Sequence, residues 1–176
     1  MKDSLQIEQS QFEKQDSIYR KLFLNNPHRI DYEKFPDIQR ADIDLVIKNR
    51  SNKPVRISEK YRPYDYGDIL FEVWSVYPNK KGWVYETKAD ILAYWFPARV
   101  VIIEIQKVRE IFENNGISMK TTLPEKTRQM TEIEIEGNIY KPYLISAKNE
   151  GYVSLSLAFS LGDLDKLGIK YSVINL

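Results

Sequence analysis

The fold of this 176-residue chain is predicted from the stretch Ala41-Asp42-Ile43-Asp44-Leu45-Val46-Ile47 and from Val55-Arg56-Ile57-Ser58-Glu59-Lys60, which follows a polar turn. In the first segment, apolar residues alternate with others at the period of a β-strand. Asp44 and Lys60 lie sixteen positions apart, about the length of a strand, a short turn and a second strand. We therefore expect a hairpin that brings these two side chains together.

Helical and strand patterns extend outward from this hairpin. An apolar stripe without Gly or Pro predicts a helix over residues 4–24. Residues 42–48, 55–60 and 69–76 predict three successive strands, with a short strand possible at 29–32. A capping-box pattern at 87–90, followed by apolar residues 91–96, predicts a buried helix, and the run 99–105 predicts a central strand.

The C-terminal third has weaker patterns. Residues 108–114 predict a helix that Gly116 ends, and 118–138 predict a mobile loop or an edge strand. Two strands at 143–147 and 153–158 and a short helix at 161–167 are expected to be peripheral. The predicted fold class is α/β, with a mixed sheet flanked by helices in the order helix, three strands, helix, strand.

Composition limits the possible chemistry. The length fits a single domain, which we divide into a core of about residues 1–110 and an extension of about 111–176. The chain has no cysteine and only one histidine, His28, so disulfides, thiolate metal sites and cysteine nucleophiles are excluded. The sequence shows no secretory signal and no membrane-spanning run, and we expect a cytoplasmic protein without a membrane partner.

Positive charge is concentrated around the predicted hairpin, although the formal net charge of the chain is only +1. A basic surface of this kind can hold phosphates without reading sequence. It can equally be the charged edge of an exposed hairpin. The candidate nucleic-acid-binding residues are Lys48, Arg50, Lys53, Arg56 and Arg62.

With an acid on one strand and an acid–lysine pair on the next, the first 110 residues resemble the PD-(D/E)XK nuclease superfamily, including RecB-like nucleases and Holliday junction resolvases. The resemblance implies a restriction-endonuclease-like core. It also implies that Asp44 is a metal ligand and that Lys60 positions or activates the attacking water. The cofactor implied is Mg²⁺ or Mn²⁺, which prefer carboxylate oxygens.

Ser58 departs from this motif, because it occupies the position two before the lysine where the family has an acid. Either a bulge turns Glu59 toward the site, or another acid supplies the second ligand. Glu72 is the preferred substitute, since an unpaired carboxylate would be costly in its apolar segment. The candidate catalytic residues are Asp44, Glu59, Lys60 and Glu72, and the candidate metal ligands are Asp44, Glu59 and Glu72.

Each candidate also has a structural interpretation. Asp44 and Lys60 can form an ordinary cross-strand ion pair, and Glu59 and Glu72 can be solvated or paired acids. The leading hypothesis is a metal-dependent nuclease acting on DNA, of the compact type found in phages and mobile elements. Its oligomeric state is open, and a homodimer is one of the alternatives. The alternative is a catalytically inactive nuclease-like scaffold that binds nucleic acid or a protein partner.

Overall fold

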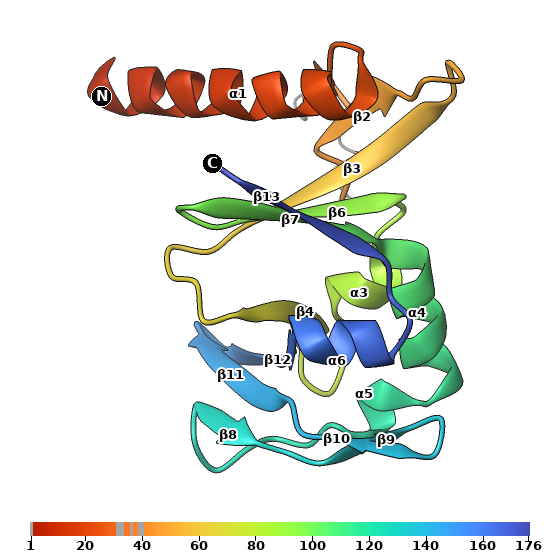
Figure 1. The fold of residues 1–176 in the computed structure, drawn as a ribbon. Coiled ribbons are helices and arrows are strands. Elements are labelled where there is room, and N and C mark those ends of the chain that lie inside the picture. Colours follow the sequence, from red (N-terminus) through yellow and green to blue (C-terminus); the bar gives the residue numbers. More distant parts are fainter. Residues whose placement is uncertain (1, 31–33, 36, 39–40) are drawn as a thin grey trace.

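The computed structural model describes residues 2–30, 34–35, 37–38 and 41–176, with side chains from Phe12 onward. It is an α/β structure built around two sheets (Figure 1). The six-stranded sheet has the order β1-β2-β3-β6-β7-β13, and only β3 and β6 run parallel. Its strands are β1 (His28–Arg29), β2 (Leu45–Lys48), β3 (Pro54–Tyr61), β6 (Ile91–Trp95), β7 (Arg99–Glu104) and β13 (Tyr171–Asn175).

The five-stranded sheet has the order β5-β4-β12-β11-β8 and is antiparallel throughout. A separate two-stranded hairpin is formed by β9 (Ile133–Ile135) and β10 (Asn138–Tyr140). The strands of the five-stranded sheet are β4 (Asp68–Val76), β5 (Lys80–Lys81), β8 (Arg128–Met130), β11 (Tyr143–Asn149) and β12 (Tyr152–Ser160).

Helices cover both faces of the six-stranded sheet (Figure 1). On one face lies α1 (Lys2–Phe23), whose Tyr19 packs in a cluster with Leu45, Ile57 and Trp95. On the other face, α3 (Trp83–Glu86), α4 (Ile105–Asn114) and the five-stranded sheet enclose the larger apolar core, around Phe71, Phe112 and Phe159. Two further short helices are α5 (Ile117–Lys120) and α6 (Leu161–Lys166).

The helix predicted over residues 91–96 is wrong, because Ile91–Trp95 forms strand β6 between β3 and β7. This strand is apolar on both sides, since α1 packs on one face of its sheet and the larger core on the other. A short apolar run of this kind has no periodicity that separates a buried strand from a buried helix. The Thr87 hydroxyl accepts a bond from the amide of Ala89 in a local turn, so the apparent capping box has another role.

The three-strand meander is also wrong at its third strand, because β4 joins the five-stranded sheet and pairs with β12 and β5. The two predicted C-terminal strands, β11 and β12, are interior strands of the five-stranded sheet rather than peripheral, and a further strand, β13, forms an edge of the six-stranded sheet. Segment 118–138, predicted as a loop or edge strand, contains α5, β8 and β9. The predictions of the helix at 108–114 and of the two strands and short helix at the C-terminus are confirmed.

Candidate active site

The C-terminal half of β3 presents its side chains to opposite sides of the six-stranded sheet, as strand alternation requires. Ser58 and Lys60 contact Asp42, whereas Glu59 contacts residues of α1. No bulge interrupts the pairing of β3 with β6, which stays in register from Ile57 to Tyr61. The bulge that would turn Glu59 toward Lys60 is therefore absent.

The partner of Lys60 is Asp42 rather than Asp44. Lys60 Nζ lies 2.5 Å from Asp42 Oδ1, and the Ser58 hydroxyl donates a 2.9 Å hydrogen bond to Asp42 Oδ2. Both charged side chains are about a quarter exposed, at 23% for Lys60 and 24% for Asp42. A carboxylate thus lies against Ser58, the position where the motif has its own acid.

The backbone around Asp42 is held in a left-handed conformation, with φ of 53°. Aspartate tolerates this region better than most residues, yet such local strain is found preferentially at functional sites. The segment after α3 fixes the turn: the amide of Lys88 donates to the Ala41 carbonyl at 2.8 Å, and the Thr87 hydroxyl donates to the Asp42 carbonyl at 3.3 Å. Asp42 is therefore positioned by the segment after α3 through its backbone and by β3 through its side chain.

Asp44 lies next to this group. Its Oδ2 accepts a 2.5 Å hydrogen bond from the backbone amide of Glu59, beyond the end of the β2–β3 ladder. The carboxylates of Asp42 and Asp44 therefore bind two adjacent residues of β3, Ser58 and Glu59. The expected proximity of Asp44 to the Lys60 segment is observed, but its hydrogen bond is to the backbone.

Glu59 is an internal anchor for α1. Its side chain is 4% exposed and accepts hydrogen bonds from the Tyr19 hydroxyl at 2.8 Å, from Trp95 Nε1 at 3.1 Å and from Arg29 Nη1 at 2.7 Å. Burial, together with the negative charge of Glu59, holds the pKa of Tyr19 well above its usual value. The Glu59 carboxylate is thus satisfied on the α1 face, on the side of β3 opposite Lys60.

Glu72 belongs to β4 in the other sheet. Its Oε2 accepts hydrogen bonds from the Ser75 hydroxyl at 2.6 Å and from the Trp83 amide at 3.2 Å. The Trp83 ring in turn lies 5.2 Å from Lys60 Nζ in a cation–π contact. Glu72 therefore orients the residue that packs against Lys60.

The acids predicted as a metal site do not form one group. Among the described residues, no group of three or more His, Cys, Asp or Glu side chains could hold a metal ion. Mg²⁺, however, often uses only one or two protein carboxylates and takes its remaining ligands from water and substrate phosphate. Asp42 and Asp44 fit this smaller requirement, because both supply carboxylate oxygens and both accept hydrogen bonds from neighbouring residues of β3.

The predicted phosphate-binding residues divide into two classes. Lys48, Arg50 and Lys53 are exposed around the β2–β3 turn. Arg56 is paired with Asp90 at 2.7 Å. Burial raises the pKa of the Asp90 carboxyl, but the Arg56 hydrogen bonds outweigh this effect and lower it. Arg62 forms an ion pair with Asp68 on β4.

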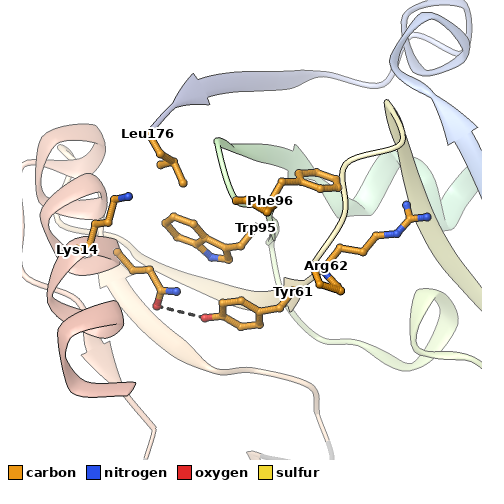
Figure 2. Close-up of a pocket in the computed structure, with 9 residues that line it drawn as sticks. Lys14, Tyr61, Arg62, Trp95, Phe96 and Leu176 are labelled. Carbon is orange, nitrogen blue, oxygen red and sulfur yellow. Dashed lines mark hydrogen bonds between the residues drawn. The ribbon is translucent and has the colours of Figure 1, made fainter. Parts of the chain in front are cut away.

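A pocket of about 370 Å³ opens at the end of β3, between α1 and the C-terminus (Figure 2). Its walls are mostly apolar and aromatic, with Lys14 and Arg62 among its lining residues. The Tyr61 hydroxyl donates a 3.2 Å hydrogen bond to Gln15, as the dashed line in Figure 2 shows. Burial, together with the negative charge of Glu59, raises the pKa of Tyr61.

Asp42 is the residue that sequence reasoning missed. The sequence signal for it is its position two before Asp44, which strand alternation would place on the same side; in the structure Asp42 lies in a left-handed turn instead of an extended segment. None of the helices in the described part of the chain combines the length and apolar character needed to cross a membrane. No family model matches the sequence, and no curated protein or solved structure matches the chain.

Proposed function

We propose that this protein is a metal-dependent nuclease that hydrolyses phosphodiester bonds in DNA, with Asp42, Asp44 and Lys60 at its reaction centre. The observation that supports it most is the contact of the Asp42 carboxylate with both Ser58 and Lys60. Asp42 would thereby replace the acid that the PD-(D/E)XK motif has at position 58. Glu59 and Glu72 are then supporting residues instead of ligands.

The element order agrees with this proposal. The chain passes from α1 through the antiparallel strands β1, β2 and β3, then through a crossover containing α3, to β6 beside β3. This is the order helix, three strands, helix, strand that a restriction-endonuclease-like core implies, with β4 and β5 inserted in the crossover. The third strand of that core is then β3 rather than β4.

The side chains have distinct tasks in this proposal. Asp42 and Asp44 would hold Mg²⁺ or Mn²⁺, which when bound would neutralise phosphate charge and lower the pKa of a bound water. Lys60 donates hydrogen bonds to the phosphate oxygens as negative charge develops on them. Asp42 keeps the Lys60 ammonium in place before substrate binds, because Asp42 Oδ1 lies 2.5 Å from Lys60 Nζ.

The second candidate is a non-catalytic scaffold that binds nucleic acid. It is favoured by the saturation of the site: Asp42 is neutralised by Lys60, and Asp44 accepts a backbone hydrogen bond. In this alternative the two aspartates only fix the end of β3. Nucleic acid would then bind without metal and without a requirement for Asp42.

A cleavage assay separates the two candidates. Labelled linear, circular, branched and single-stranded DNA is incubated with wild type, Asp42→Asn and Lys60→Met in Mg²⁺, Mn²⁺ or EDTA. Glu150→Gln, a change at an exposed acid in the β11–β12 turn, is the matched control. The nuclease proposal requires metal-dependent cleavage by wild type and the control, lost in both site variants; absence of cleavage on every substrate rejects it in favour of the scaffold.

A further inference from the structure

Aromatic rings and guanidinium groups form a row along one edge of the molecule, outside the proposed reaction centre. The row passes from the loop between β3 and β4 to strands β8 and β11 of the five-stranded sheet. We call it the tyrosine–arginine row, and it consists of Tyr64, Tyr66, Arg62, Arg128 and Tyr143.

Successive members of the row are in contact. The ring centroids of Tyr64 and Tyr66 are 6.3 Å apart. The guanidinium carbon of Arg128 lies 5.1 Å from the centroid of Tyr66 and 4.2 Å from that of Tyr143, and that of Arg62 lies 4.9 Å from Tyr66. Tyr66 thus contacts one further ring and two cations, and Arg128 links it to Tyr143.

These rings are not part of the core. Tyr64 is 67% exposed and Tyr66 is 60% exposed, whereas Tyr143 is 36% exposed, with Arg128 over its ring. Tyr64 and Tyr66 thus expose a large part of their aromatic surface, and an exposed group of this kind is typical of binding sites. The extent and contiguity of the row distinguish it from single exposed apolar residues.

A buried acid fixes the cations of the row. The Asp68 side chain, 8% exposed, forms ion pairs with both Arg62 and Arg128, the latter at 3.0 Å. Asp65 is paired with Arg99, which extends the positive charge toward Phe96. Three arginines thus oppose two aspartates, and Arg128 remains about one-third exposed with N–H groups for a further partner.

The row leads to the pocket at the end of β3. Arg62 lines that pocket (Figure 2). It also lies over Tyr66, so one side chain belongs to both features. In Figure 2, Arg62 extends away from α1, and Tyr61 and Trp95 lie on the α1 side. Lys14 adds a second cation to the pocket lining.

We propose that the tyrosine–arginine row binds an unpaired nucleic-acid strand, whose bases stack on Tyr64, Tyr66 and Tyr143 while Arg128 binds the phosphates. The stacking surface of each ring accepts any base, and guanidinium groups bind phosphate by paired hydrogen bonds. In a duplex the base faces are covered by neighbouring pairs, so the row selects single-stranded regions. This inference rests on the proposed function in taking nucleic acid as the ligand, and it names the substrate class as single-stranded or branched.

Binding in EDTA tests the row without cleavage. Fluorescence anisotropy of a labelled 20-nucleotide oligonucleotide is measured with wild type, Tyr66→Ala and Arg128→Gln. Tyr152→Ala is the matched control, because Tyr152 is an exposed tyrosine at the opposite end of the β11–β12 hairpin. We expect each row variant to bind about tenfold more weakly or worse, and the control to bind as wild type does.

A second measurement uses only the wild-type protein, so its result does not depend on the folding of a variant. The wild-type protein is photo-crosslinked to an oligonucleotide containing 5-iodouracil, and the modified peptides are identified by mass spectrometry. Crosslinks at Tyr64, Tyr66 or Tyr143 support the row; crosslinks confined to other tyrosines overturn it. Two binding results would also overturn the proposal: equal affinity for single strands and duplex, or unchanged affinity of both row variants. A third is binding of a decaproline peptide in place of the oligonucleotide, because exposed aromatic rings can also bind proline-rich peptides.

The two proposals fail separately. Loss of cleavage in Asp42→Asn with intact oligonucleotide binding, together with weaker binding by the row variants, supports both the reaction centre and the row. If wild type binds single strands through the row but cuts nothing, the row stands and the nuclease proposal falls. If wild type cuts DNA and the row variants bind and cut as wild type does, only the row is rejected.

Discussion

The hydroxyl of Ser58 donates a 2.9 Å hydrogen bond to Oδ2 of Asp42, a residue 16 positions earlier in the chain. The other oxygen of that carboxylate pairs with Lys60, two positions further along β3. A serine on one segment and an aspartate on another thus bring a carboxylate next to the lysine. The predictions below test which contacts around this group act in catalysis and which act in folding.

We predict that Glu59→Gln destabilises the protein without altering its chemistry. The substitution removes a buried charge that Arg29 and two further donors satisfy, and the expected loss is about 2–3 kcal/mol in the free energy of unfolding. Urea unfolding measures the loss, and cleavage per folded molecule is measured below the transition. If the Glu59→Gln variant is as stable as wild type but does not cleave DNA, Glu59 acts as a metal ligand instead.

We predict a pH-dependent contribution from Asp90. Its pKa is lowered in the folded state because hydrogen bonds from Arg56 outweigh the effect of burial. The resulting stabilisation is present above the ordinary carboxyl pKa and is lost as the pH falls through the lowered folded pKa. Because both side chains are substantially exposed, Asp90→Asn should cost only about 0.5–1 kcal/mol at neutral pH.

The check is urea unfolding of wild type and Asp90→Asn at neutral pH and at about pH 3, below the usual pKa of aspartate. The difference between the two proteins should shrink at acid pH. A difference that stays constant over this range would show that the Arg56–Asp90 ion pair does not cause it.

We predict that Gly82→Ala is severely destabilising. A Cβ at this position would lie 2.1 Å from the backbone oxygen of Glu72, so strand β4 or helix α3 must move. The expected cost is about 3 kcal/mol or more. Because Glu72 also accepts from the Trp83 amide, the shift should weaken the contact of Trp83 with Lys60 as well.

Gly162→Ala is the matched control for that substitution. Gly162 lies in helix α6, where the nearest atom to an added Cβ is the Ser160 hydroxyl oxygen at 3.8 Å. Alanine should be neutral or stabilising there by up to about 1 kcal/mol. Thermal unfolding compares the melting temperatures of the two variants. Similar melting temperatures would contradict the steric argument.

The sequence predicts the hairpin of β2 and β3 correctly, because alternation places Leu45, Ile47 and Ile57 on one buried face. It fails at β6, where the residues are buried on both sides and the helical and strand periods cannot be distinguished. It also fails at β4, because the choice between two sheets depends on pairing with β12, more than 80 positions away. Local pattern contains no information about that partner.

The candidate site was predictable in part. Lys60 and the aspartate-containing segment do meet, but the lysine pairs with Asp42, since the turn at positions 41–42 adopts a left-handed conformation held by Thr87 and Lys88. The position of Glu59 beside Lys60 predicts a place in the site, but strand alternation indicates the opposite face, where Glu59 lies. The cost of burying an acid predicts a metal or cation at Glu72, but hydrogen bonds from Ser75 and Trp83 relieve that cost.

The most direct test of the central claim is to exchange the acid and the serine. Rates of Mg²⁺-dependent DNA cleavage are compared for wild type, Asp42→Ser, and the double variant Asp42→Ser with Ser58→Asp, with circular dichroism to verify folding. If Asp42 replaces the motif acid, Asp42→Ser should lose about 100-fold or more in rate, and the double variant, with its acid on β3, should recover about tenfold or more of that loss. A correctly folded double variant no faster than Asp42→Ser, or an Asp42→Ser variant as fast as wild type, would contradict the account.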